Sequence, residues 1–375
     1  MRIGVPQSDY NAQRNIVGAL PWWAKRVRPL ERCRLITAIR YRLRLPPSLP
    51  SQFGFADPYV PAVDLLHFFN SVAESRTPWV TTFETSLPRW GEVSRRNQRR
   101  GLDLALSASC RRLFALSDAA LQIALRDWRA ELTQGEMQAL TSKTEVLLPP
   151  QPILCSARDK PEAPTIDFAF VGADLYRKGG LEFIKALQRL QSRGITGWSA
   201  RIIGRLNSFG DYASRTDRSH AEQARKLLDG LGSLVRQQDR ATPGEVMEVL
   251  KRSHFFVFPT LADTFGYSAL EAKACGAIVI STNVRALPEI NSPRTGMVIE
   301  LPLDERREFH RFQDIEAGKR LLTDALESCL IRAMNMSTSE RIELADAATA
   351  QLGLQHDPNR HSARLAETYL AAIGA

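Results

Sequence analysis

The stretch Phe258–Gly276, FPTLADTFGYSALEAKACG, decides the fold that we predict for the C-terminal half of the chain. The apolar run His254–Phe258 before it predicts a buried strand, and the pattern over 267–275 predicts a helix. Asp263 lies in the connecting loop and Glu271 in the early helix. Carboxylates at such a helix start can accept hydrogen bonds from the vicinal hydroxyls of a sugar or a ribose. The alternative is that Glu271 only complements the dipole of the first helical turn.

A second loop, Phe170–Gly180 with the sequence FVGADLYRKGG, has the same order of strand, loop and helix. The predicted strand ends near Gly172, and the predicted helix over 179–192 opens on a pair of glycines. Glycines permit close approach of the backbone, and a helix N-terminus offers free N–H groups and the positive end of a dipole. Lys178 adds a full positive charge there. Together the two loops favour a diphosphate-binding site.

Strand and helix patterns alternate along the chain, which predicts α/β domains with parallel sheets and ligands at the carboxyl ends of the strands. Beyond residue 165 the predicted strands are Asp167–Val171, Arg201–Ile203, His254–Phe258 and Ala277–Ser281, and the predicted helices span 179–192, 218–230, 243–251 and 267–275. Before residue 150 the strand pattern is weaker, with candidates at Arg2–Val5, Asp64–Phe68, Trp79–Phe83, Arg112–Leu116 and Glu145–Leu148. Residues 149–164 hold five prolines, which predicts a linker between two domains.

Composition excludes several classes of protein. The 375 residues are enough for two domains, and 44% hydrophobic with 24% charged residues is typical of a globular protein. No apolar run of about 18 residues occurs, so we predict no helix that spans a bilayer. The segment Met1–Pro6 lacks the apolar core of a signal peptide. Five scattered cysteines without a Cys/His cluster predict free thiols, a reducing compartment and no zinc site.

The two loops resemble the donor motif of the retaining family-4 glycosyltransferases, also called group 1, which have the GT-B fold. That motif has two glutamates eight positions apart, with Phe-Gly after the first and Ala after the second. The matching residues here are Phe265, Gly266, Glu271, Ala272, Ala274 and Gly276. Asp263 stands where the family usually has Glu, which keeps the charge but shortens the reach of the side chain. The resemblance covers about 165–300, with Arg285-Ala286 in place of a glycine pair common in the family.

The resemblance implies an α/β architecture of two Rossmann-like domains that face each other across a cleft. Residues 1–150 would form the N-terminal acceptor-binding domain, 151–164 the linker and 165–357 the donor-binding domain, and a helix at 358–375 would pack back on the first domain. The implied donor-binding residues are Gly172, Arg177, Lys178, Gly179, Gly204, Thr264, Phe265, Gly266, Tyr267 and Glu271.

The N-terminal half resembles the family more loosely. Asp64–Asn70 looks like a family strand that carries a histidine, here His67. Pro78–Glu84 looks like the next strand, whose end often carries a histidine near the donor sugar and here carries Glu84. With Asp263, these two residues are the predicted catalytic groups. The alternatives are that His67 only packs beside its aromatic neighbour and that Glu84 only caps the following turn.

Positive charge is concentrated in the first domain. Of the net charge of +9, residues 1–150 contribute 21 Lys/Arg against 13 Asp/Glu, and 22–45 alone hold eight Lys/Arg against one acid. Pro29 and Pro46 bound a helical pattern there, with an apolar face that could pack on the domain. We predict that Arg40, Arg42 and Arg44 lie on the acceptor or membrane side, where cations attract anionic lipid. A solvated basic helix is the alternative.

These features together predict a hexosyltransferase-type enzyme that moves a sugar from a nucleotide-diphosphate sugar to a saccharide or lipid-linked acceptor. Retention at the anomeric carbon and a place in polysaccharide or glycolipid assembly are implied by the resemblance alone. No Asp-x-Asp motif occurs, so we expect no metal, and no cofactor besides the co-substrate. We expect a cytoplasmic protein, at the inner face of a membrane if the basic segment binds lipid, and no nucleic-acid partner. The alternatives are a catalytically silent GT-B scaffold subunit, a nucleic-acid-binding protein acting through the basic N-terminal segment, and an epimerase or phosphorylase on the same fold.

Overall fold

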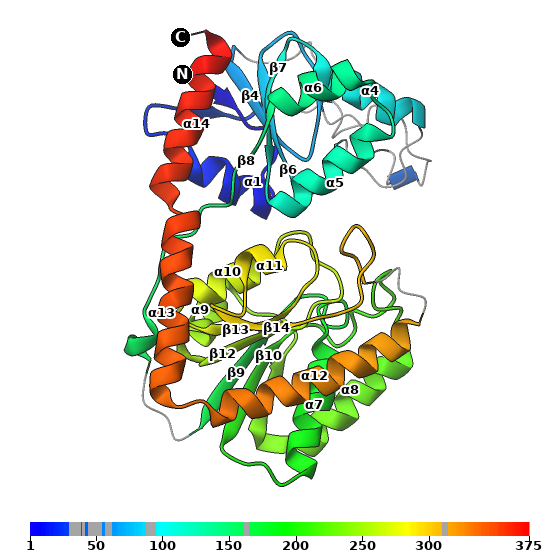
Figure 1. Cartoon of the computed structure of the whole chain (residues 1–375), viewed down its shortest axis with the longest axis vertical. Coiled ribbons are helices and arrows are strands. Elements are labelled where there is room, and N and C mark those ends of the chain that lie inside the picture. Colours follow the sequence, from blue (N-terminus) through cyan, green and yellow to red (C-terminus); the bar gives the residue numbers. More distant parts are fainter. Residues whose placement is uncertain are drawn as a thin grey trace. The chain divides into compact units, whose positions relative to one another are not determined.

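The computed structural model describes residues 1–29, 39, 42–43, 55–56, 62–87, 95–160, 165–309 and 314–374. The chain forms two compact units: Met1–Pro150 together with His356–Ala375, and Gln151–Gln355 (Figure 1). Of the proline-rich stretch 149–164, Pro149 and Pro150 belong to the first unit and the described residues from Gln151 onward belong to the second. Each unit contains one six-stranded sheet in which all the neighbouring strands are parallel.

The first unit has a central sheet with helices around it. Its sheet strands are β1 (Arg2–Gly4), β2 (Lys25–Val27), β4 (Leu65–Phe69), β6 (Trp79–Phe83), β7 (Cys110–Ala115) and β8 (Thr144–Val146), and β3 (Phe55–Ala56) pairs with β5 (Ala73–Glu74). Its helices are α1 (Tyr10–Asn15), a 3₁₀ helix at Val17–Ala19, α4 (Arg95–Leu106), α5 (Asp118–Arg129), α6 (Gln134–Ser142) and α14 (Pro358–Ile373). The sheet order is β2-β1-β4-β6-β7-β8.

The burial of the two central strands, β4 and β6, indicates that both faces of this sheet are covered. Every residue of β4 and of β6 is buried, as expected for parallel strands with helices on either side. Large aromatic side chains fill the core: the rings of Phe68 and Trp79 lie 6.1 Å apart at their centroids, and so do those of Phe83 and Trp128. These residues belong to one buried core cluster that includes both strands and α5.

The C-terminal helix α14 is part of the first unit. The ring nitrogens of His361 lie 2.8 Å from the carbonyl oxygen of Leu148 and 3.0 Å from that of Asn15, and these oxygens accept from the ring. Arg364 makes a bidentate ion pair with Glu145. The last helix of the chain is therefore held to the sheet of the unit with which the chain begins.

The second unit has the strand order of a dinucleotide-binding domain. Its strands are β9 (Ile166–Val171), β10 (Trp198–Ile203), β11 (Val235–Gln238), β12 (Phe255–Phe258), β13 (Ile278–Thr282) and β14 (Gly296–Ile299), in the order β11-β10-β9-β12-β13-β14. Its helices are α7 (Gly180–Ser192), α8 (Arg218–Leu231), α9 (Pro243–Arg252), α10 (Tyr267–Ala274), α11 (Leu287–Ile290), α12 (Ile315–Asn335) and α13 (Thr338–Gln355), with short 3₁₀ helices at Ala157–Asp159 and Gly232–Leu234.

Two groups of helices cover this sheet. Helices α7, α8 and α12 pack together on one face, and α9, α10 and α13 pack together on the other (Figure 1). In the sheet order the first strand, β9, lies beside the fourth, β12, so the chain reverses its direction of travel between them. Such a switch point is where ligands bind in doubly wound sheets, beyond the carboxyl ends of the strands.

Candidate functional site

The two loops singled out in the sequence meet at this switch point. The loop after β9 leads into α7, and the loop after β12 leads into α10. Backbone contacts join them: the N–H of Leu261 donates to the carbonyl oxygen of Arg177 at 3.0 Å. The N-termini of α7 and α10 therefore belong to adjacent loops, which gives one place two positive dipole ends.

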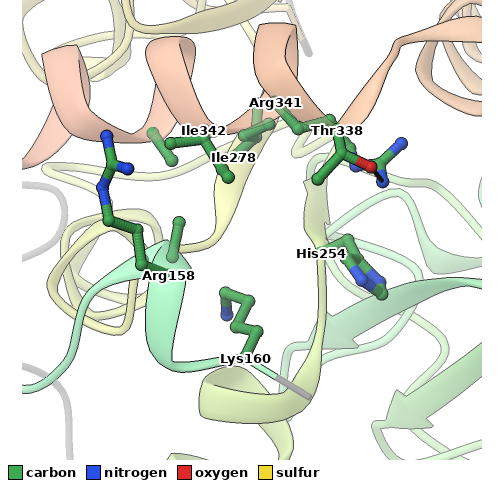
Figure 2. Close-up of a pocket in the computed structure, with 10 residues that line it drawn as sticks. Arg158, Lys160, His254, Ile278, Thr338, Arg341 and Ile342 are labelled. Atoms are coloured by element: carbon green, nitrogen blue, oxygen red, sulfur yellow. Dashed lines mark hydrogen bonds between the residues drawn. The ribbon is translucent and has the colours of Figure 1, made fainter. Parts of the chain in front are cut away.

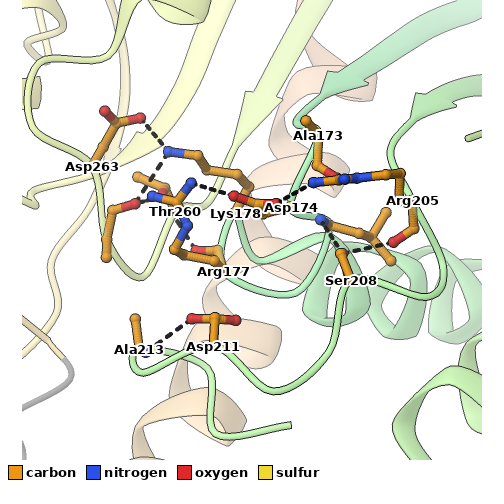
Figure 3. Close-up of polar contacts among 12 residues, drawn as sticks. Ala173, Asp174, Arg177, Lys178, Arg205, Ser208, Asp211, Ala213, Thr260 and Asp263 are labelled. Carbon is orange, nitrogen blue, oxygen red and sulfur yellow. Dashed lines mark hydrogen bonds and ion pairs between the residues drawn. The ribbon is translucent and has the colours of Figure 1, made fainter. Parts of the chain in front are cut away.

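An ion pair links the loops at the side-chain level (Figure 3). Lys178 Nζ donates to Asp263 Oδ2 at 2.6 Å and to the carbonyl oxygen of Ala262 at 3.2 Å. The ammonium also lies 5.5 Å from the centroid of the Phe258 ring. Its third N–H meets no partner in the part of the chain that the structure describes. Lys178 thus presents a positive charge with one uncommitted donor at the end of the sheet.

Asp263 is held in its ionised form. Burial favours the neutral acid, but the Lys178 ammonium and the hydrogen bonds to the carboxylate outweigh it, so the pKa of Asp263 lies below its ordinary value. Oδ1 accepts from the backbone N–H of Thr264 at 2.7 Å and of Phe265 at 3.3 Å. Burial lowers the pKa of Lys178, while Asp263 opposes that change. Both oxygens of Asp263 are therefore engaged within the loops.

Two glycines make the close approach of the loops possible. Gly179 precedes α7 with φ +74°, and a Cβ there would clash with the carbonyl oxygen of Pro259. Gly266 precedes α10 with φ +105°, and a Cβ there would meet the side chain of Leu287. Both backbone conformations are costly for other residues, so each helix start requires glycine.

A second charged cluster adjoins the first; the sequence predicted its Arg177 but missed Asp174 and Arg205. Asp174 Oδ2 accepts from Arg177 at 2.5 Å, and Asp174 Oδ1 accepts from Arg205 at 2.6 Å (Figure 3). Arg205 follows the end of β10, and its Nε–H donates to the carbonyl oxygen of Ala173 at 3.0 Å. The sequence could have indicated Arg205 as a site residue, because it is a charged residue just beyond the end of a predicted strand. Three cations therefore lie at this edge, two of them sharing one carboxylate.

The structure places the remaining predicted donor-binding residues at the same edge. Gly172 directly follows β9, and Gly204 directly follows β10. A Cβ added at Gly204 would lie 2.7 Å from the carbonyl oxygen of Gly172, so the two strand ends approach each other closely. Thr264 and Tyr267 are partly exposed, whereas Phe265 is buried. Glu271 lies in the second turn of α10, also partly exposed.

In the first unit, Glu84 follows β6 at the carboxyl edge of the sheet. It is 4% exposed, and its carboxylate accepts from the side-chain amides of Asn11 at 3.0 Å and Asn70 at 3.1 Å. Its backbone N–H donates to Asn70 Oδ1 at 2.9 Å. Asn70 follows β4 with φ +55°, a left-handed conformation that Asn tolerates. The sequence reasoning missed both asparagines, although Asn70 directly follows the strand that contains His67.

His67 lies deeper in this unit. The ring is 0% exposed, and its nitrogens are bonded to the Tyr369 hydroxyl at 2.6 Å and to the Thr82 hydroxyl at 3.0 Å. Burial, with a smaller effect of His361, lowers the pKa of His67 to about 3. A neutral ring with both nitrogens engaged inside the unit argues against the predicted catalytic role. We infer that His67 is a packing residue that anchors α14.

Most of the basic segment lies outside the described residues, including Arg40 and Arg44. Arg42 is helical and exposed. Ile39 and Leu43, from the apolar face predicted to pack on the domain, are 54% and 61% exposed, which contradicts that packing. No helix within the described ranges is long and apolar enough to cross a bilayer. Within the same ranges, no group of three or more His, Cys, Asp or Glu side chains is arranged to hold a metal ion.

Solved structures with this fold cover the whole chain. A glycosyltransferase from Rickettsia africae matches with a TM-score of 0.62 and 13% identity over 99% of this chain and 98% of its own. WaaG, a glycosyltransferase involved in lipopolysaccharide biosynthesis, matches with a TM-score of 0.60 and 14% identity over 100% of both chains. HepE from Anabaena, solved with UDP, matches with a TM-score of 0.60 and 16% identity over 99% of both. At these identities the likeness shows the fold: two Rossmann-like α/β units, as in the GT-B fold predicted from the sequence.

Sequence similarity to curated relatives covers about a third of the chain or less. A D-inositol 3-phosphate glycosyltransferase of Paenarthrobacter aurescens is 33% identical over 133 residues, which is 35% of this chain and 31% of that protein. One from Streptomyces bingchenggensis is 30% identical over 105 residues, 27% of this chain and 22% of that protein. The chain thus spans less than a third of the length of these relatives. A family model described as glycosyl transferases group 1 matches residues 157–308. By this match, residues 157–308 are similar to the group 1 glycosyltransferases.

Proposed function

We propose that the chain is a glycosyltransferase whose second unit binds a nucleotide-diphosphate sugar and whose first unit binds the acceptor. The observation that carries this proposal is the meeting of Lys178 and Asp263 at the switch point, between the starts of α7 and α10. Two helix N-termini and an uncommitted ammonium donor suit a diphosphate. The names of the relatives, and the UDP and UDP-glucose in solved structures of the same fold, support this reading.

The proposed reaction requires that negative charge on the leaving diphosphate be stabilised, and this site supplies positive charge for that purpose. The bond between the anomeric carbon and the diphosphate oxygen breaks, and its electron pair goes to the nucleoside diphosphate. An acceptor hydroxyl oxygen then bonds to the anomeric carbon and loses its proton. The leaving diphosphate gains negative charge, and Lys178, Arg177 and the helix N-termini stabilise it in the transition state. Because this charge comes from side chains and dipoles, we propose that transfer needs no metal.

The two acids of the motif take different parts in this proposal. Glu271, partly exposed on α10, accepts hydrogen bonds from the ribose hydroxyls. Asp263 orients Lys178 through Oδ2 and contacts the sugar. The shorter side chain of Asp263 limits its reach, so its contribution to the sugar is tested separately below. Retention at the anomeric carbon is proposed from the family resemblance alone. Identifying the anomer of the product tests it.

On the acceptor side, we assign Glu84 the contact with the acceptor hydroxyl. Two asparagine amides fix its carboxylate at the carboxyl edge of the sheet, which is where ligands bind in such folds. Glu84→Gln should lower kcat much more than it changes nucleotide affinity. Asn11→Ala is the matched variant: it leaves the acid but removes one donor that positions it, and should lower kcat less. Equal turnover in Glu84→Gln and the unaltered chain would remove Glu84 from the site.

The acceptor in this proposal is a saccharide or a lipid-linked saccharide at an anionic membrane surface, as in polysaccharide or glycolipid assembly. The eight Lys/Arg in 22–45 support it. Binding to vesicles with anionic lipid should fall steeply from 0.1 to 1 M salt, because the Debye length shrinks from about 10 Å to about 3 Å. Charge reversal at Arg40, Arg42 and Arg44 should abolish vesicle binding and leave nucleotide affinity unchanged. Binding to duplex DNA or single-stranded RNA instead of vesicles would contradict the membrane assignment.

A thermal-shift screen of UDP-, GDP- and ADP-sugars tests the donor assignment and identifies the base. A bound donor raises the melting temperature, and the increase grows with the logarithm of its concentration. Stabilisation by one nucleotide class, with sugar transfer or donor hydrolysis, supports the enzyme. Stabilisation without any turnover would favour the catalytically silent scaffold. No stabilisation by any of them would contradict the donor site.

A further inference from the structure

The second unit contains a cavity that the proposed reaction does not use. Its volume is about 420 Å³, and its walls are the 3₁₀ helix Ala157–Asp159, the beginnings of β12 and β13 and the first turns of α13 (Figure 2). His254 directly precedes β12 and Ile278 begins β13, so the cavity lies where the strands start. The Lys178 site lies where the strands end. The two sites are therefore at opposite edges of one sheet.

The lining of this cavity is basic. Arg158, Lys160, His254 and Arg341 are among its ten lining residues, and none of the ten is acidic. Of the acids close by, Asp346 pairs with one nitrogen of the lining residue Arg158 at 2.7 Å, and Glu340 caps the start of α13 through Ser337. The cavity consequently has a positive lining with no carboxylate in its wall.

The cations differ in how much of their hydrogen-bonding capacity is already used. Lys160 Nζ lies 2.7–3.2 Å from four carbonyl oxygens at the ends of α9 and α10, and burial lowers its pKa to about 8. Lys160 therefore supplies charge but no spare donor. Arg158 is 65% exposed at its side chain and pairs through Nη2 alone with Asp346. Its remaining N–H groups have no partner among the described residues.

Two further lining residues, Arg341 and His254, each keep a donor that the described residues do not engage. Arg341 is fixed by hydrogen bonds from Nη1 to the Met336 carbonyl oxygen at 2.6 Å and from Nη2 to the Thr338 hydroxyl at 3.0 Å. Nε–H of Arg341 is left without a partner in the described ranges. His254 Nδ1 accepts from the backbone N–H of Asp167 at 3.0 Å, which places the ring proton on Nε2. That Nε2–H also meets no group in the part of the chain described.

We propose that this cavity binds a small organic phosphate. A phosphate monoester carries close to two negative charges and three acceptor oxygens, which matches Arg158, Arg341 and His254 as donors with Lys160 as additional charge. The volume exceeds that of the phosphate group alone, and Ile278 and Ile342 give one side of the cavity an apolar wall for a sugar or base. The site is separate from the nucleotide-sugar site and does not depend on the function proposed for it.

Calorimetry on the full chain tests this site. The probes are glucose 6-phosphate, AMP and inorganic phosphate, with glucose, adenosine and sulfate as matched compounds without the phosphate monoester. At least one organic phosphate should bind more tightly than sulfate. Arg158→Gln and Arg341→Gln should each weaken it about ten- to a hundredfold, the loss of a charged hydrogen bond.

Two control variants separate this site from other causes. Arg218→Gln removes an exposed cation from α8, away from the lining, and should leave the affinity unchanged. Lys178→Ala should also leave it unchanged, because Lys178 lies at the other edge of the sheet. Arg158→Gln is not expected to disturb folding, since its side chain is largely exposed. Organic phosphates that bind no better than sulfate, or that bind Arg158→Gln and Arg341→Gln as well as the unaltered chain, would overturn the proposal.

Discussion

Replacing Lys178 by alanine should weaken the binding of a nucleoside diphosphate by about 10- to 150-fold. The structure leaves one N–H of the Lys178 ammonium without a partner, and a phosphate oxygen is its natural acceptor. A hydrogen bond to a charged group is worth about 1.5–3 kcal/mol, which gives this range of affinities. Isothermal titration calorimetry with UDP and GDP measures it directly, and Lys226→Ala, an exposed lysine on α8, is the charge-matched control.

The same substitution should destabilise the chain, because Asp263 loses its counter-charge. The side chains are only 12% and 16% exposed, and breaking a buried pair costs about 3–5 kcal/mol. Asp263 keeps two backbone N–H donors, so we expect the lower end, near 3 kcal/mol. That corresponds to a fall of about 6–12 °C in the melting temperature of a unit of this size.

Asp263→Asn gives the discriminating result. The Asp263 carboxylate competes with the phosphate for the Lys178 ammonium. Removing the carboxylate charge should therefore leave nucleotide affinity the same or raise it, while turnover falls. An unchanged affinity in Lys178→Ala would refute the placement of the diphosphate at these loops. A loss of nucleotide affinity in Asp263→Asn as large as that in Lys178→Ala would refute the competition between carboxylate and phosphate.

Three further variants and one treatment test other parts of the account. Gly179→Ala should lower the melting temperature by several degrees, because its positive φ and the Pro259 carbonyl oxygen leave no room for a Cβ; an unchanged value would show that the loops can separate. Glu271→Gln should weaken nucleotide binding, as measured by calorimetry, and equal affinity would remove the ribose contact. His67 has a depressed pKa, so the unfolded state binds the extra proton and stability falls as pH drops from about 6.5 toward 3. Urea unfolding should therefore show that His67→Gln loses about 2 kcal/mol less than the unaltered chain between pH 6.5 and pH 5, and equal losses would contradict the buried neutral ring. EDTA should leave turnover unchanged, and a loss restored by Mg²⁺ or Mn²⁺ would overturn metal independence.

The sequence predicted those elements whose pattern is local. The helix predicted at 243–251 is α9, because Thr242 caps it and Pro243 occupies its first turn. The apolar strands beside the site were predicted to within a few residues at each end. By contrast, β11 was missed because its sequence, VRQQ, belongs to a polar edge strand, and the edge strand β2 (KRV) was missed for the same reason.

Within the candidate site, the sequence predicted features formed by residues that are close along the chain. It did not predict contacts between residues that are far apart in the sequence. Each loop was identified in the sequence by glycines and charged residues next to a predicted helix start. The bond between Lys178 and Asp263 depends on β9 and β12 being neighbours, which the strand order decides and no local pattern encodes. His67 shows the same limit, because its partner Tyr369 lies on the last helix of the chain. Its burial could not be foreseen from the strand alone.

Release of nucleoside diphosphate from UDP-, GDP- and ADP-sugars, followed by ³¹P NMR with and without a lipid-linked saccharide fraction, tests the central claim most directly. The account predicts that one donor class releases its diphosphate, faster when the acceptor fraction is present, and that Lys178→Ala and Asp263→Asn slow this release while Lys226→Ala does not. Release that is equal in Lys178→Ala and the unaltered chain, or no release from any of these donors under either condition, would contradict it.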